Sequence, residues 1–203
     1  MWTEKDLLIS KEHKEHFKLF TEVADRVINS ELARESRQRR GEMGATYETE
    51  VHKLVNTERR KAGLAELQYD DALAEIAEKH SIDMSPAGRH FYDDEDRVNL
   101  IYRDYTYPNH HTNPDGLRVY DRYRKAGYSG CIAYGENILY YSNSNLAKMS
   151  KQEIAQKIMY GTHGWWNSPS HRANILSSKF NREGLGIYAY GDTVWATQNF
   201  SKK

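Results

Sequence analysis

The chain has 203 residues, enough for one well-packed domain and an extension. Its 29 basic and 29 acidic side chains balance, which excludes the strongly basic surface of a general nucleic-acid binder. A single cysteine, Cys131, excludes an intramolecular disulfide, so packing has to hold the core. No apolar run approaches the roughly 20 residues of a membrane span, and the first residues do not resemble a signal peptide.

Residues 1–44 predict an amphipathic helical extension that ends in a glycine-containing linker. Apolar residues recur at helical spacing from Phe17 to Ile28, and the periodicity is then lost. Such an apolar stripe has to cover something, so we expect residues 5–33 to pack on the main domain or on a second copy of the chain. The main domain is expected to occupy residues 45–203.

Two helices are expected to open this domain. Residues 47–62 carry apolar side chains at helical spacing and stop before Gly63, a residue that often ends helices. Residues 69–84 begin with acidic side chains, which favour a helix N-terminus. The same helix places His80 on its apolar face, so His80 is interpreted as a core histidine.

A long polar segment with many tyrosines follows and has little periodicity. Segments of this length are usually functional or mobile, and we expect the tyrosine-rich insert, residues 91–113, to set the choice of ligand or partner. His110 and His111 lie in this insert, where metal binding is one interpretation, but they are interpreted as solvated side chains.

The second half of the chain alternates between strands and helices. A short helix is predicted over residues 115–127 and a buried strand over residues 133–141. Ser150 and Glu153 form a capping box for the next helix, which is expected to run toward a pair of tryptophans until Pro169 interrupts it.

A β-hairpin is predicted to close the chain, because the apolar residues 185–190 and 194–200 lie on either side of Gly191 and Asp192. The predicted order begins with helices and continues with strands and helices in alternation, which indicates an α/β fold. We expect a three-layer α-β-α sandwich with a central antiparallel sheet, plus the N-terminal helical extension.

Several motifs follow one another in residues 47–200: Asn56-Thr57-Glu58-Arg59, Gly135-Glu136-Asn137-Ile138, Trp166-Asn167-Ser168-Pro169-Ser170-His171-Arg172, Gly184-Leu185-Gly186 and Thr197-Gln198-Asn199-Phe200. In this order they resemble the CAP superfamily, which includes cysteine-rich secretory proteins, venom allergens, plant pathogenesis-related proteins and prokaryotic SCP-like extracellular proteins. The Ser-Pro-x-His-Arg stretch and the single cysteine are most similar to the prokaryotic branch.

The resemblance implies an α-β-α sandwich with a cleft lined by two histidines and two acidic residues, which in some members hold a divalent metal such as zinc. His90 and Glu136 match the first histidine and the first glutamate of the family, and His171 matches the histidine of the prokaryotic motif. Ser168 stands where a second acidic residue is expected. Gln198 is predicted to line the same cleft, with His90 and His171 as the ligands of zinc or another divalent cation.

The chemistry of these residues leaves alternatives open. Two imidazoles and water make an incomplete zinc shell, in which Glu136 would be the general base of a hydrolase. Alternatively, Glu136 and His171 are structural polar groups that satisfy hydrogen bonds. A Ser-His-Glu arrangement with Ser168 or Ser170 lacks a nucleophile elbow. His163 is a candidate for an additional cleft ligand.

We therefore expect a non-enzymatic, extracytoplasmic binding or interaction module whose ligand or surface partner is unidentified. The missing second acidic residue favours binding over catalysis. A divalent-metal-dependent hydrolase is the alternative, and lipid or sterol binding, which some family members perform, is a third. The resemblance implies an extracellular or cell-surface location, with membrane association only if an anchor precedes Met1, and no nucleic-acid partner is expected.

Overall fold

The computed structural model describes residues 46–85, 111–113 and 115–203. Residues 45–203 form one compact unit. The predicted helical extension, His90 and most of the tyrosine-rich insert lie outside the described residues. None of the helices in the described part of the chain has the length and apolar character needed to cross a bilayer.

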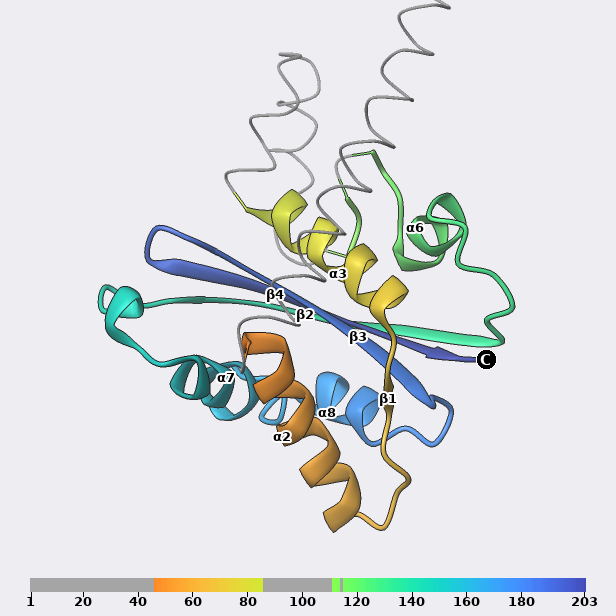
Figure 1. Ribbon diagram of the computed structural model, residues 1–203, viewed down its shortest axis with the longest axis horizontal. Helices are drawn as coiled ribbons and strands as arrows, with labels where there is room; N and C mark the ends of the chain where they lie inside the picture. Colours follow the sequence, from red (N-terminus) through yellow and green to blue (C-terminus); the bar gives the residue numbers. More distant parts are fainter. Residues whose placement is uncertain (1–45, 86–110, 114) are drawn as a thin grey trace, which may run out of the picture. The chain divides into compact units, whose positions relative to one another are not determined.

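A four-stranded sheet lies between two layers of helices (Figure 1). In the spatial order β1-β3-β4-β2, the strands are β1 (Gln68–Tyr69), β3 (Arg182–Tyr190), β4 (Thr193–Lys202) and β2 (Ala133–Ser142). The helices of one face are α3 (Asp71–Met84) and α6 (Val119–Lys125), and those of the other are α2 (Tyr47–Lys61), α7 (Lys151–Tyr160) and α8 (Pro169–Ile175). The predicted three-layer α-β-α sandwich is confirmed.

The sheet is mixed rather than wholly antiparallel. β3 and β4 form the predicted hairpin, and β4 also pairs antiparallel with β2, which lies at the edge of the sheet. β1 pairs in parallel with β3. The sequence did not predict β1, because a strand of two residues has no alternating pattern to detect.

Side chains that precede the helices satisfy their free N–H groups. Thr46 Oγ1 accepts a hydrogen bond from the Thr49 amide at the start of α2. A carboxylate oxygen of Asp70 accepts from the first turn of α3. The predicted capping box of Ser150 and Glu153 opens α7, which confirms that interpretation.

Pro169 has a different role from the one predicted. The preceding helix, α7, already ends at Tyr160, and Pro169 is the first residue of the separate helix α8. Proline suits this position because its fixed φ matches a helix and its missing N–H would have no partner there. His171 therefore lies in the first turn of α8 and not in a turn after a helix.

Gly184 and Gly186 bring α3 against the backbone of β3. A Cβ atom added at Gly184 would lie 2.2 Å from the Ala74 nitrogen, and one at Gly186 would lie 2.0 Å from the Glu78 nitrogen. No side chain fits between helix and strand at these two points. The close approach places the middle of α3, including His80, over the face of the sheet that carries Glu136.

Apolar side chains fill both spaces beside the sheet. Between the sheet and α2, α7 and α8, the fully buried Trp165 is the largest member of the main core, and Trp166 packs against it from a partly buried position. Tryptophan side chains bury a large apolar area, so this pair anchors the core. The other face holds a smaller cluster, made of Leu73, Ile76, Tyr123 and Tyr128.

Candidate functional site

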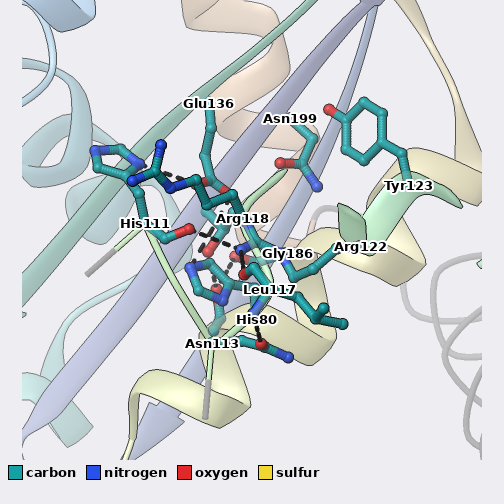
Figure 2. A network of polar contacts seen from close by, with 12 residues as sticks. His80, His111, Asn113, Leu117, Arg118, Arg122, Tyr123, Glu136, Gly186 and Asn199 are labelled. Carbon is teal, nitrogen blue, oxygen red and sulfur yellow. Dashed lines mark hydrogen bonds and ion pairs between the residues drawn. The ribbon is translucent and has the colours of Figure 1, made fainter. Parts of the chain in front are cut away.

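Glu136 is the centre of a buried polar cluster on the face of the sheet that α3 and α6 cover. It lies in the edge strand β2 and is 7% exposed. Oε1 is 2.9 Å from His111 Nδ1, and Oε2 accepts from Nη2 of Arg122 on α6. Figure 2 shows these side chains converging from different segments. A carboxylate in such a position is paired on both oxygens.

Arg122 joins three parts of the chain. In addition to its ion pair with Glu136, its Nη1 donates to the carbonyl oxygens of His111, at 2.9 Å, and of Leu117, at 3.1 Å. The side chain is 5% exposed. Because a buried guanidinium needs acceptors for its donors, Arg122 fixes the backbone around His111 and Leu117 to strand β2.

His80 and Asn199 complete the surroundings of Glu136 (Figure 2). The Nε2 atom of the buried His80 lies 4.0 Å from Glu136 Oε2. The side-chain amide of Asn199, oriented by its hydrogen-bond partners, donates to Glu136 Oε2 at 3.2 Å and accepts from the Ala77 amide at 3.2 Å. The predicted core histidine is thus buried, as expected, but beside the carboxylate of the site.

These neighbours keep Glu136 ionised. Burial by itself would raise the pKa of its carboxyl group, but the hydrogen bond from His111 and the charges of His80 and Arg122 bring the pKa below its ordinary value. The group is therefore a stable anion at neutral pH and a weak base.

Asn113 attaches the backbone near His111 to the C-terminal end of α3. Its side-chain oxygen accepts from the Leu117 amide at 2.8 Å, and its side chain also bonds Asp83. Asp83 is 6% exposed, and its Oδ2 has no hydrogen-bond partner. Burial, opposed by the charge of Lys79 and the bond to Asn113, raises the pKa of Asp83 to about 6.

His171 lies on the other side of strand β2, in α8. Its side chain is partly buried, and Nδ1 has no hydrogen-bond partner. Burial, followed by the charge of His111, lowers the pKa of the imidazole. The ring is therefore neutral at neutral pH, the state in which a histidine can bind a metal or accept a hydrogen bond.

The residues predicted to share one cleft do not all meet. Gln198 is fully buried on the opposite face of the sheet from Glu136, where its side chain bonds Glu183, so it does not lie beside Glu136. Neighbouring strand residues point to opposite faces, and Asn199 takes the place beside Glu136 instead. Ser168 precedes α8, and its Oγ lies 3.2 Å from Ser170 Oγ. His90 lies outside the described residues.

Two residues of the cluster escaped the sequence analysis. His111 was interpreted as solvated, but it bonds Glu136 although its side chain is 48% exposed. Arg122 was overlooked because a charged residue on a short helix usually faces solvent. A usable signal was the Asn-x-x-Gly sequence of Asn113 to Gly116, which is typical of a turn. The candidate ligand His163 is exposed.

Among the described residues, no group of three or more histidine, cysteine or acidic side chains is arranged to hold a metal ion. His111 binds Glu136 through Nδ1, which leaves Nε2 as the other ring nitrogen. In metal sites, a carboxylate that bonds the other ring nitrogen of a metal-binding histidine orients its ring in this way. The described part of the site therefore offers two imidazoles, of His111 and His171, with a carboxylate behind the first.

The chain matches the family model described as CAP, the cysteine-rich secretory protein family, over residues 52–200. The uncharacterized protein YkwD of Bacillus subtilis (strain 168) is 28% identical over 158 residues, which cover 78% of this chain and 48% of the relative. The uncharacterized membrane protein YlbC of the same organism is 29% identical over 158 residues, which cover 78% of this chain and 35% of the relative. The chain thus spans half or less of the length of these relatives.

A solved structure shows the same fold. An extracellular protein containing an SCP domain from Bacillus anthracis strain Ames aligns with a TM-score of 0.50 and 26% sequence identity, over 77% of this chain and 40% of that chain. The alignment with an outer surface protein of Borrelia burgdorferi has a TM-score of 0.47 and 16% identity, over 75% of this chain and 90% of that chain.

Proposed function

This chain belongs to the CAP family of cysteine-rich secretory proteins, and from that membership we propose that its domain is a non-enzymatic binding module that works outside the cytoplasm. The extracytoplasmic location is supported by the relative from Bacillus anthracis, which is described as extracellular. The ligand is a molecule or surface partner that remains to be identified.

The pairing of Glu136 carries the proposal of a non-enzymatic role. A general base needs an oxygen that can reach the proton it removes and a pKa near the working pH. In Glu136, His111 engages Oε1, Arg122 engages Oε2, and the pKa is lowered. Glu136 therefore acts as an anchor that holds His111 and α6 to the sheet.

An activity screen on the full chain tests this role. The wild-type protein and the Glu136→Gln variant are incubated with ester, peptide and phosphodiester substrates, with and without zinc. We expect no turnover above the buffer background for either protein. Turnover by the wild type that disappears in a Glu136→Gln protein with an unchanged circular dichroism spectrum would show a hydrolase and contradict the proposal.

A divalent metal is the second candidate, and the arrangement of His111 favours it. We propose that His111 Nε2 and His171, together with the predicted ligand His90, hold the ion. Glu136 would orient the first imidazole, and the low pKa of His171 keeps the second one unprotonated. When bound, the ion would act as a Lewis acid that attracts an anionic or carbonyl group of the ligand.

Calorimetric titration with zinc tests the metal site in the full chain. We expect heat of binding from the wild type and its loss from His111→Ala and His171→Ala. His163→Ala is the matched control, because His163 is an exposed histidine outside the cluster. The absence of heat from the wild type, or its retention in both cluster variants, would contradict the metal site.

A further inference from the structure

We propose that Asn137, Gln198 and Glu183 form a hydrogen-bonded chain that positions His171 from the face of the sheet opposite Glu136. The inference rests on the proposed function, because His171 belongs to the proposed site. It assigns a role to three buried side chains that the site itself does not use. Two of them, Gln198 and Glu183, come from β4 and β3, far from His171 in sequence.

Asn137 holds α8 at two points. Its Nδ2 donates to the His171 carbonyl oxygen at 3.1 Å, and its Oδ1 accepts from Asn174 Nδ2 at 2.8 Å. Asn174 also donates to the Glu136 carbonyl oxygen at 3.3 Å. Residues three apart in a helix lie on the same side, so these contacts fix both the height and the rotation of α8. They therefore fix the backbone from which the imidazole of His171 projects.

The orientation of the Asn137 amide depends on Gln198. Asn137 Nδ2 donates to Gln198 Oε1 at 2.9 Å, and both side chains are fully buried. If either amide turned over, two donors or two acceptors would face each other without water to relieve them. An unsatisfied buried polar group costs about 1–3 kcal/mol, so the two amides are locked together.

Glu183 sets the donor-to-acceptor direction of every hydrogen bond in this chain of side chains. Its carboxylate is fully buried and can only accept: Oε2 accepts from Gln198 Nε2 at 2.5 Å, and Oε1 from His52 Nδ1 at 2.5 Å. Gln198 must therefore present Nε2 to Glu183 and Oε1 to Asn137. Asn56 Nδ2 lies 3.2 Å from His52 Nε2 at the far end. The acceptors of Glu183 thus determine which end of the Asn137 amide reaches His171.

Two double variants that differ only at position 198 test this order. In Glu183→Gln with Gln198→Glu, the amide and the carboxylate exchange places, and every bond of the chain keeps a donor and an acceptor. In Glu183→Gln with Gln198→Met, the side chain has a similar length but no strong acceptor for Asn137. Thr197→Val is the control, because it removes the bond from Ser81 on the opposite face of the same strand.

The readout is the carbon-bound proton signals of the His171 ring and the hydrogen exchange of the Asn137 side-chain amide, measured by NMR at one fixed pH without ligand. We expect the exchanged variant and Thr197→Val to keep the wild-type signals. The methionine variant should move the His171 signals and lose the slow exchange of the Asn137 amide. If that double variant does not fold, Gln198→Met alone is read in the same way.

Unchanged His171 signals in the methionine variants, or equal changes in the methionine and exchanged variants, would overturn the proposal. Because the measurement needs no metal and no partner, its outcome is independent of the experiments on function. If the NMR results are as expected but the protein binds no zinc, the metal site is contradicted and this inference stands.

Discussion

Arg122 and Glu136 form an ion pair in the interior of the domain, where the arginine side chain is 5% exposed and the glutamate side chain 2%. The pair joins helix α6 to the edge strand β2 and also fixes the backbone carbonyl of His111. Both partners of a buried ion pair have to be present, because removing either one leaves the other as a charge that neither water nor a counter-ion stabilises.

Glu136→Gln should lower the free energy of unfolding by about 3–5 kcal/mol, since it leaves the guanidinium of Arg122 buried without its anion. Urea denaturation at neutral pH measures the loss. The double variant Arg122→Met with Glu136→Leu should recover much of it, because no charge then remains to be desolvated. The single variants Arg122→Met and Glu136→Leu complete the cycle, and a loss in the double variant equal to the sum of their two losses would show that the pair is not coupled.

Asp83→Asn should stabilise the domain at neutral pH by about 2–3 kcal/mol, because the pKa of Asp83 rises from 3.8 to about 6 on folding. Its contribution to stability is complete below pH 4 or so and is lost as the pH rises through about 6. The difference between the two proteins in urea denaturation should therefore be large at pH 7.5 and small at pH 4.5.

The groups that face Asp83 are Lys79, Asn113, Asp115 and Arg122, so the same titration in Lys79→Met is the control. Removing this cation should raise the pKa of Asp83 further and increase the gain from the asparagine. A stability difference that does not vary with pH would contradict the assignment to Asp83.

Gly186→Ala should lower the free energy of unfolding by about 3 kcal/mol or more, because the new methyl group would meet the backbone of α3, which cannot move aside as a side chain could. The control is Gly191→Ala in the hairpin turn, where there is open space but φ is +61°. That change should cost about 1 kcal/mol from the left-handed backbone alone. Thermal denaturation compares the two, and equal losses would argue against the close contact.

Arg59→Lys should destabilise the domain by about 2–3 kcal/mol, although the charge is kept. Arg59 is 2% exposed and donates to the carbonyl oxygens of Ala65, Ile175 and Ser177. A single ammonium group cannot reach three acceptors in different directions. The matched change Arg60→Lys, at an exposed position of the same helix, should have little effect in the same urea experiment.

The predicted self-association through residues 5–33 is tested by sedimentation. The full chain should sediment as a dimer or larger species, because an apolar helical stripe needs a partner surface. A chain that begins at Gly44 should sediment as a monomer. Monomer masses for both proteins would contradict the prediction and leave packing on the main domain as the role of the stripe.

The sequence predicted those parts of the fold that depend on local chemistry. The capping box at Ser150, the glycine turn at Gly191 and the apolar periodicity of α2 each act within a few residues, and all of these elements are present. The role of Pro169 was predicted wrongly, because the same residue stops one helix and starts another. Because α7 ends at Tyr160, well before Pro169, the proline starts a new helix and does not stop the preceding one.

The candidate site was harder to predict, because its contacts join distant segments. Glu136 was identified, but its partners His111 and Arg122 depend on how a turn and a short helix fold back on β2. The face on which Gln198 lies depends on the register between β2 and β4, and a shift of one residue reverses it. Neither relationship leaves a periodic pattern in the sequence.

Glu136 and Asn137 are neighbours in one strand, yet they belong to separate polar systems on opposite faces of the sheet. A slip of β2 by one residue would bury the asparagine amide against the cation of Arg122 and bring a second carboxylate close to Glu183. The polar groups on the two faces thus favour the same register of β2, and every register shifted by one residue leaves them mispaired on both faces. Strand β2 lies at the edge of the sheet and has a neighbour on one side only. The dipeptide Glu136-Asn137 therefore helps to set its register.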